Sequence, residues 1–445
     1  MFPRQRNDLE LNSVSAYVCP NRINQLLSNI ESILKVDLNY GSDDPLAIDS
    51  ISPDAIVELR GPEGVDDDAA VDVIRDALLL PVAGPPLSEH VIPGDRVIIA
   101  QAGDLPGGTM LSDSIYSVIL ESLQSGGVSP DDVQRIIAPS IIKSDTSSLS
   151  HELPDTEIQN LSTSIYNPLN DSDTAYLSAD EAGEPLHLGR ALIDADVVLS
   201  IGSFGYDASL CGRSPEGELW PSFARQTQCQ KFIKALLKNR QRALHHWRDE
   251  SEQINAQLGI LASLRLVAGD HKTLAGAAFG FPISSIAQSK SYAKGWRPAI
   301  SARSPLTIAG IPDRPCRFIE VTRAVAAAAR VTTHDGTICI ACNMKEEPGI
   351  IFTRWRHGID LPMLLREASD SEETVLLLDA LHTSLFAQAL GDRRLVLLSH
   401  LDQEFVEDLD IGYAETPAAI NRLIQQSESV TVLHEANRLC PKKIC

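Results

Sequence analysis

A strand, a glycine-rich turn, a helix and a second strand follow one another between residues 96 and 138, and this unit constrains the fold most. Residues 96–102 form an apolar run, RVIIAQA, and residues 110–125 carry apolar side chains at helical spacing. Gly126 and Gly127 end the helix before the next apolar run at residues 133–138. The pattern predicts a βαβ crossover with two parallel strands.

The same alternation continues along the chain. Further strands are predicted at residues 36–41, 56–59, 196–201, 261–267, 306–310, 337–342, 394–398 and 429–433. Because helical segments separate most of them, we expect an α/β fold with mostly parallel sheets. A stretch rich in Gly, Pro and Ser at residues 293–304 predicts two α/β domains, residues 1–292 and residues 300–445, with a cleft between them.

Composition limits the partners that this chain can have. Of its 445 residues 43% are hydrophobic, and the net charge is −22. Nucleic acids and anionic membranes are therefore poor partners, since their phosphates repel an acidic protein. No apolar run approaches the length of a membrane span, and the N-terminus has no apolar signal segment. Eight scattered cysteines are typical of a reducing cytoplasm, where we expect the protein, and the oligomeric state stays open.

A candidate site lies where the strand at residues 196–201 ends. Ligands of open α/β sheets bind at the carboxyl ends of strands, and here a long polar loop runs from Gly202 to Pro221. The Gly103–Gly108 loop after the first strand can approach a phosphate, and a plain tight turn is the alternative. The candidate side chains, for which solvated loop positions are the alternative, are Asp104, Asp207, Cys211, Arg213, Glu216 and Glu218.

Three other patterns favour structural roles. Cys339 and Cys342 lie in a predicted buried strand, so their thiols need not converge on a metal. His245 and His246 are adjacent on a helix and do not share a face, which favours a surface position. Three aspartates at residues 66–68 are typical of a helix start. No metal ligands are predicted from the sequence.

The order and spacing of several motifs resemble the nickel-dependent lactate racemase family from Val36 onward. In the first half the resemblance rests on PPLSEHVIPGDRVIIAQAGD and ALIDADVVLSIGSFGYD. In the second half it rests on IAGIPD, FIEVTRAVAAAARVTTHDGTICIACNMKEEPG and GYAETPAAINRLIQQSESVTVL. The resemblance implies an isomerase that interconverts D- and L-2-hydroxyacids. It also implies a nickel-pincer nucleotide tethered to a lysine, with two histidines as alternate general bases.

The chain departs from the family's site residues. The family's Asp-x-x-Arg-Pro loop corresponds to residues 104–108. Its aspartate is present as Asp104, but Gly107 and Gly108 replace its arginine and proline. The first histidine is absent from residues 139–142, and the second falls on Asp207. The lysine falls near residues 216–218, which contain two glutamates and no amine.

Two hypotheses follow from these departures. The first is a 2-hydroxyacid racemase or epimerase with a degenerate site, and the second is a non-catalytic member that binds a small carboxylate or a partner. The candidate catalytic residues are Asp207, Glu218 and Asp104. The candidate cofactor-binding residues are Gly103, Gly107, Gly202, Glu320 and Arg323, the last two at the family's Gln-x-x-Lys pair.

Overall fold

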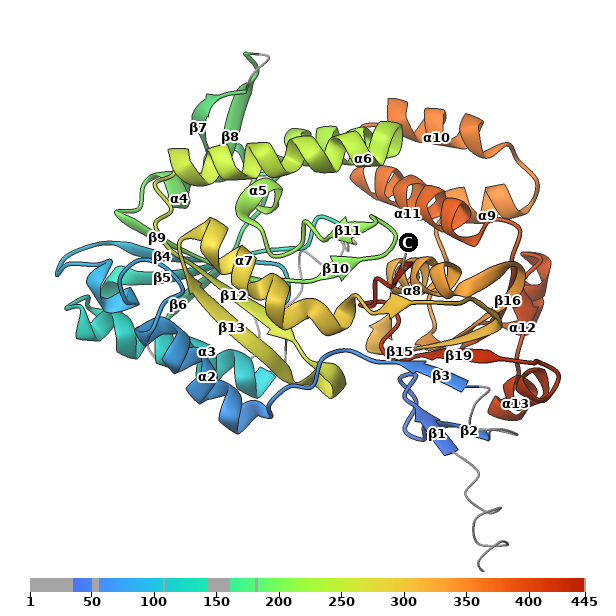
Figure 1. Ribbon diagram of the computed structural model, residues 1–445. Coiled ribbons are helices and arrows are strands. Elements are labelled where there is room, and N and C mark those ends of the chain that lie inside the picture. The colour runs from blue at the N-terminus through green and yellow to red at the C-terminus, as the bar shows by residue number, and fades with distance from the viewer. Residues whose placement is uncertain (1–34, 50–55, 107–108, 143–160, 181–182, 444–445) are drawn as a thin grey trace, which may run out of the picture.

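Two six-stranded sheets form the framework of the molecule (Figure 1). The computed structural model describes residues 35–49, 56–106, 109–142, 161–180 and 183–443. All strand pairs of the second sheet and all but one of the first are parallel. The predicted α/β class with mostly parallel sheets is therefore confirmed.

The first sheet contains the predicted βαβ unit. Its strands, in spatial order, are β13 (Leu274–Gly280), β12 (Ser263–Ala268), β9 (Val197–Ser203), β4 (Val97–Ala102), β5 (Val133–Ala138) and β6 (Ser162–Ile165). Helix α3 (Thr109–Ser125) connects β4 to β5, as predicted. Strand β13 pairs antiparallel with β12, and residues 273–281 were not among the predicted strands. Small residues pack there because the edge strand lies close under α7 (Pro282–Tyr292), where Gly276 meets the ring of Tyr292.

The second sheet draws strands from both ends of the chain. Its order is β18 (Gly412–Tyr413), β17 (Arg394–Leu398), β16 (Thr332–Met344), β15 (Ser304–Cys316), β19 (Val430–Leu433) and β3 (Ile56–Leu59). Strand β3 pairs with β19, so an element from the first sixty residues completes the sheet formed by the C-terminal residues. The division into residues 1–292 and 300–445 remains a prediction, and β3 crosses it.

Helices cover both faces of the two sheets. On the first sheet, α2 (Asp67–Leu79) and α3 pack on one face, and α4 (Arg190–Ile193), α5 (Leu219–Ser222) and α6 (Gln226–Gln257) pack on the other. On the second sheet, α8 (Phe318–Val331) and α11 (Thr374–Leu390) pack on one face. On its other face lie α13 (Pro417–Gln425) and the hairpin of β1 (Lys35–Leu38) and β2 (Leu46–Asp49).

Two hydrophobic clusters join the two sheets. Leucines of α11 pack with Trp247 and other residues of α6, and α6 crosses the top of both halves (Figure 1). Trp296, which follows α7, packs in the same cluster as Ala309 and Ile311 of β15. This apolar continuity fixes the two sheets relative to each other, since separating them would expose large buried side chains.

The remaining elements are short or lie at the periphery. The helices α9 (Ile350–Arg356) and α10 (Leu361–Asp370) pack near α11, and α12 (Gln403–Asp408) precedes β18. Three small pairs complete the described strands: β7 (Thr174–Ala179) with β8 (Pro185–Gly189), β10 (Tyr206–Asp207) with β11 (Gly212–Arg213), and β14 (Ala299–Ile300) with β20 (Lys442–Lys443). In the described part of the chain, no helix combines the length and apolarity needed to cross a membrane.

The patterns interpreted as structural have the expected positions. Cys339 and Cys342 are both buried, but they face different hydrophobic clusters on opposite sides of the second sheet. His245 and His246 are exposed on α6 and pair with Asp249 and Glu250. Asp66 caps the N-terminus of α2, where its carboxylate accepts a hydrogen bond from the Ala69 amide.

Candidate functional site

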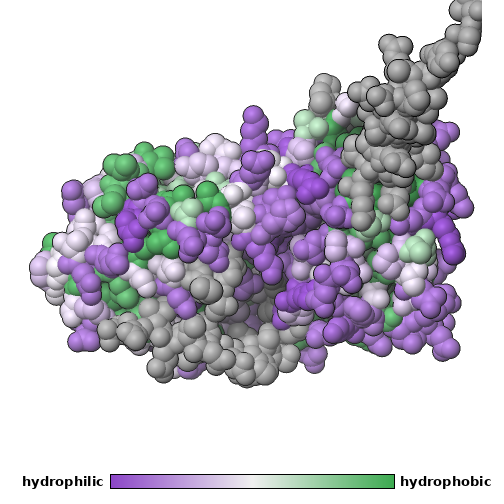
Figure 2. Space-filling view, turned by 90° about the horizontal axis from the view of Figure 1, so that it is seen from below, coloured by the Kyte–Doolittle hydropathy of each residue, from purple (hydrophilic) through white to green (hydrophobic). Residues whose placement is uncertain are grey.

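A polar pocket of about 140 Å³ lies where the carboxyl ends of the two sheets face each other. From the first sheet come Asp104 after β4, Ser140 after β5 and the start of the loop after β9. From the second come Asp313 of β15, Arg323 of α8, and Asn437 and Arg438 after β19. The surface between the halves is hollowed and its rim is mostly hydrophilic (Figure 2). The structure therefore has a pocket at the predicted edge of the strands.

Asp207, a candidate base, is buried and uses both of its carboxylate oxygens in contacts with neighbouring residues. Its side chain is 1% exposed. One carboxylate oxygen accepts hydrogen bonds from the Ser209 amide and hydroxyl and from the Leu210 amide, at 2.8, 2.5 and 3.1 Å. The other oxygen lies 2.9 Å from Nε of Arg323. Asp207 thus closes the β10–β11 turn and positions Arg323, and it does not line the pocket.

Arg323 connects α8 to the loop after β9. Its Nη2 lies 3.0 Å from Oε2 of Glu216, and the other oxygen of Glu216 accepts a hydrogen bond from the Ser140 hydroxyl at 2.7 Å. Burial alone would lower the pKa of Arg323, but Glu216 and Asp207 outweigh that effect and raise it. Arg323 is therefore a permanent cation that lines the pocket.

Glu218, another candidate catalytic residue, lies in a buried ion pair behind the pocket. Its Oε2 is 2.7 Å from Nη2 of Arg265, and the two side chains are 4% and 1% exposed. Arg213 lies 3.8 Å from the other oxygen of Glu218 and stacks over the ring of Trp247. Burial lowers the pKa of Arg265, and Glu218 opposes that shift. The arrangement holds the loop against β12, which carries Arg265.

The predicted glycines differ in their roles. A Cβ on Gly202 would come within 2.0 Å of the Gly217 carbonyl oxygen, so β9 and the loop approach each other too closely for a side chain. Gly103 has a φ of +67°, a conformation that favours glycine. Gly107 lies outside the described residues. The loop glycines thus shape the wall beside Asp104, which lines the pocket.

Glu320 and Cys211 have roles outside the pocket. Glu320 is buried, and its carboxylate accepts a hydrogen bond from the Arg317 amide at the start of α8. It therefore caps the helix that carries Arg323. Cys211 is exposed in the turn between β10 and β11 and has a φ of +62°. Neither residue lines the pocket.

Sequence reasoning missed the residues that the second sheet contributes. Asp313, Asn437 and Arg438 line the pocket, and the Asn437 amide donates a hydrogen bond to Asp313. A signal for Asn437 and Arg438 was present, because they follow the strand predicted at residues 429–433 in the same way that Asp207 follows β9. The sequence also did not point to Asp270 and His271, which the fold brings next to Glu435.

His382 on α11 lies behind the site as a neutral imidazole. Its Nε2 is 2.8 Å from the carbonyl oxygen of Ile142, so Nε2 carries the proton and donates it. Burial lowers the pKa of His382 to about 4, the carbonyl of Ile142 raises it, and the charge of Arg323 lowers it. The histidine therefore joins α11 to the segment after β5 in its uncharged form.

The protonation of His382 predicts an acid sensitivity of the fold. The unfolded chain binds the proton below its ordinary pKa of about 6.5, whereas the folded chain resists protonation down to about pH 4. Stability is therefore expected to fall as the pH drops through this window. The check is the urea midpoint from pH 7 to pH 4 for the wild type, His382→Gln and the exposed control His245→Gln. The prediction fails if His382→Gln retains the full slope of the wild type.

Comparison with known proteins agrees with the sequence motifs and the fold. Residues 47–211 match the family model described as the lactate racemase N-terminal domain. The lactate racemase apoprotein from Thermoanaerobacterium thermosaccharolyticum superposes with a TM-score of 0.67 and 14% identity, covering 92% of this chain and 100% of that one. A Thermotoga maritima protein gives a TM-score of 0.58 and 12% identity, covering 86% of this chain and 100% of that one.

The solved structures are similar in fold, and the family model is similar in sequence to residues 47–211. At 14% and 12% sequence identity, these two structures show similarity of fold and nothing about function. A search among curated proteins found no match. The family model covers residues 47–211, and over this segment the chain is similar to the lactate racemase N-terminal domain, in agreement with the motifs.

Proposed function

We propose that this chain binds a small carboxylic acid bearing hydroxyl or amino groups in the pocket between the two sheets. The observation that carries the proposal is Arg323, a buried guanidinium that lines the pocket beside the hydroxyl-bearing residues Ser140, Ser203 and Ser214. A guanidinium has five N–H donors, and those of Arg323 that Asp207 and Glu216 do not use can bind a ligand carboxylate. Three carboxylates, of Asp104, Glu216 and Asp313, also line the pocket and suit donor groups on the same ligand.

The size of the pocket supports a small ligand. Its volume of about 140 Å³ is below the range of roughly 300–1,000 Å³ typical of drug-sized ligands. A short 2-hydroxyacid or an amino acid is therefore a better candidate than a nucleotide.

The residues present do not fit a lysine-tethered nickel-pincer nucleotide. No described residue that lines the pocket is a lysine, histidine or cysteine. Where the resemblance implies the lysine, Glu216 pairs with Arg323, Gly217 packs against the backbone at Gly202, and Glu218 pairs with Arg265. Intact-mass and nickel measurements on purified protein test this point. A covalent adduct together with one nickel per chain would overturn it.

The binding proposal is tested with Arg323→Lys, which keeps the positive charge but loses the planar fork. Calorimetric titration with a panel of D- and L-2-hydroxyacids and amino acids is expected to identify a ligand for the wild type. We expect Arg323→Lys to bind that ligand at least roughly tenfold more weakly. Arg225→Lys, at an exposed ion pair with Asp171, is the matched control and keeps wild-type affinity.

Two results would contradict the binding proposal. One is a wild-type protein that binds no member of the panel. The other is an Arg323→Lys variant that binds as tightly as the Arg225→Lys control.

A second candidate is an isomerase that moves a proton rather than a hydride. It is favoured by the carboxylates on opposite sides of the pocket, Asp104 on the first sheet and Asp313 on the second, since two bases can serve the two faces of one carbon. Incubation of the bound ligand with protein in D₂O would then place deuterium on the α-carbon. Retention of the α-hydrogen would contradict this proton-transfer reaction.

A further inference from the structure

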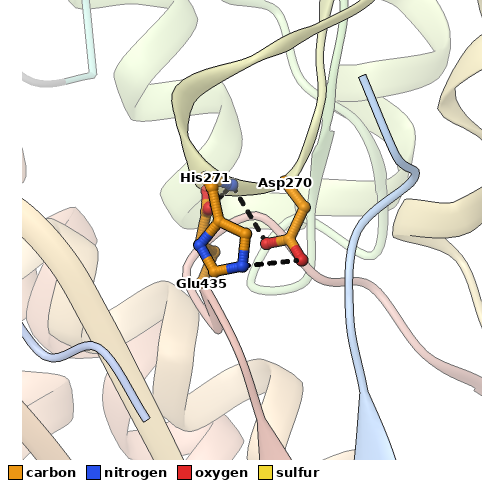
Figure 3. Close-up of side chains that lie close together, drawn as sticks. All are labelled: Asp270, His271 and Glu435. Carbon is orange, nitrogen blue, oxygen red and sulfur yellow. Dashed lines mark hydrogen bonds and ion pairs between the residues drawn. The ribbon is translucent and has the colours of Figure 1, made fainter. Parts of the chain in front are cut away.

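Three metal-ligating side chains from distant parts of the sequence meet beside the pocket. Asp270 and His271 lie in the turn between β12 and β13, and Glu435 follows β19 (Figure 3). One ligand atom of each lies within 4.8 Å of the others. The His271 amide donates hydrogen bonds to Oε1 of Glu435 at 2.7 Å and to Oδ1 of Asp270 at 3.1 Å. These two bonds hold both carboxylates against the same turn.

The cluster has two buried acids and one accessible imidazole. Asp270 is 9% exposed and Glu435 is 5% exposed, whereas the side chain of His271 is 61% exposed. Oε2 of Glu435 is buried and accepts no hydrogen bond, and its only close cation among the described residues is Arg438, in an ion pair at 3.2 Å. A buried carboxylate oxygen without a donor is costly unless a cation completes its surroundings.

The charged groups around Asp270 and Glu435 carry an excess of negative charge that a divalent cation can neutralise. Arg60 pairs with Glu58 and Asp270, and Arg438 pairs with Asp313 and Glu435. The His271 amide joins these two groups into one network of four carboxylates and two guanidiniums. Arg60 lies 4.0 Å from Asp270 but 2.7 Å from Glu58, and Arg438 also pairs with Asp313 at 3.6 Å. Both arginines therefore keep a carboxylate partner when an added ion takes Asp270 and Glu435.

We propose that Asp270, His271 and Glu435 form a site for a divalent transition-metal ion such as zinc. One imidazole nitrogen and two carboxylate oxygens are a ligand set that zinc accepts, and solvent completes the coordination on the exposed side of His271. The ion would neutralise the excess of two negative charges in the network. This site is separate from the pocket that holds the proposed carboxylate.

The position of the site gives the ion a structural consequence. Ala268, two residues before Asp270, lines the pocket, as do Asn437 and Arg438 just after Glu435. An ion on all three ligands therefore joins the β12–β13 turn of the first sheet to the segment after β19 of the second. We infer that it fixes the distance between two walls of the pocket and stabilises the fold.

The experiment uses the full chain stripped with chelator and titrated with zinc chloride by calorimetry. The wild type is expected to bind one zinc per chain at this site and to melt at a higher temperature with zinc than without it. Glu435→Gln and His271→Ala are expected to weaken binding at least roughly tenfold. Because the imidazole of His271 is exposed, we expect His271→Ala to fold normally. It therefore tests the site even if Glu435→Gln does not fold.

The matched control is His245→Ala, which removes an exposed histidine paired with Asp249 at 3.1 Å. It is expected to bind zinc as the wild type does. The proposal is overturned if the wild type binds no zinc. It is also overturned if His271→Ala binds zinc as tightly as His245→Ala. Neither result depends on the ligand of the pocket, so the carboxylate proposal is judged separately.

Discussion

Replacing Glu218 by glutamine is expected to lower the free energy of unfolding by about 3–5 kcal/mol, the usual effect of breaking a buried ion pair. Glutamine keeps the shape of the side chain but removes the charge that balances Arg265, which is 1% exposed. Arg213 also loses its nearest carboxylate, at 3.8 Å. The variant leaves the buried guanidinium of Arg265 without its carboxylate and close to the positive charge of Arg213.

The measurement is the denaturant midpoint of the variant against that of two controls. Glu184→Gln removes one partner of the exposed pair with Lys231, and we expect a change of no more than about 1 kcal/mol. The double variant Glu218→Leu/Arg265→Met replaces both charges by apolar side chains and is expected to recover most of the loss. A Glu218→Gln effect as small as that of Glu184→Gln would show that water or rearrangement compensates Arg265.

Adding a single methyl group at Gly202 is expected to distort the candidate site. The new Cβ would meet the Gly217 carbonyl oxygen at 2.0 Å, and the obstacle is backbone rather than a flexible side chain. We expect Gly202→Ala to lose about 1–3 kcal/mol of stability, toward the upper end of the overpacking range. Because Gly217 lies between Glu216 and Glu218, its displacement should also weaken ligand binding through Arg323.

Gly205→Ala is the matched control in the same loop. Apart from its two chain neighbours, no described residue has an atom within 4 Å of a Cβ built on Gly205, although this glycine also lines the pocket. Thermal unfolding and ligand titration of both variants decide the prediction. If Gly202→Ala behaves as Gly205→Ala does, the loop has enough freedom to move away and the close approach does not define the site.

The sequence was informative wherever the signal was local. The strands β3, β5 and β17 have the bounds that were predicted, because apolar spacing and flanking turn residues act within a few positions. The capping role of Asp66 and the opposed burial of Cys339 and Cys342 also follow from short-range geometry. Strand β13 was missed because its small residues have weak strand propensity, and its pairing with β12 stabilises it.

The structure has a pocket after β9, where the sequence indicated a candidate site, but the partners of the loop residues could not be predicted. Asp207 and Glu218 looked like bases in a polar loop, and each lies in a buried ion pair with an arginine more than 40 positions away. Charged loop residues have the same sequence pattern whether their side chains contact solvent, a ligand or another side chain. Only the fold decides which of these partners is within reach.

The sequence by itself determined the α/β class, the resemblance to the lactate racemase N-terminal domain and the edge of the sheet where the pocket lies, because periodicity and motif order are properties of neighbouring residues. The tertiary structure decided that β3 completes the second sheet, that Arg323 and Arg265 engage the acids of the loop, and that Asp270 and His271 meet Glu435. These contacts join residues that are far apart along the chain. Their formation depends on the packing of the two sheets, which no local pattern specifies.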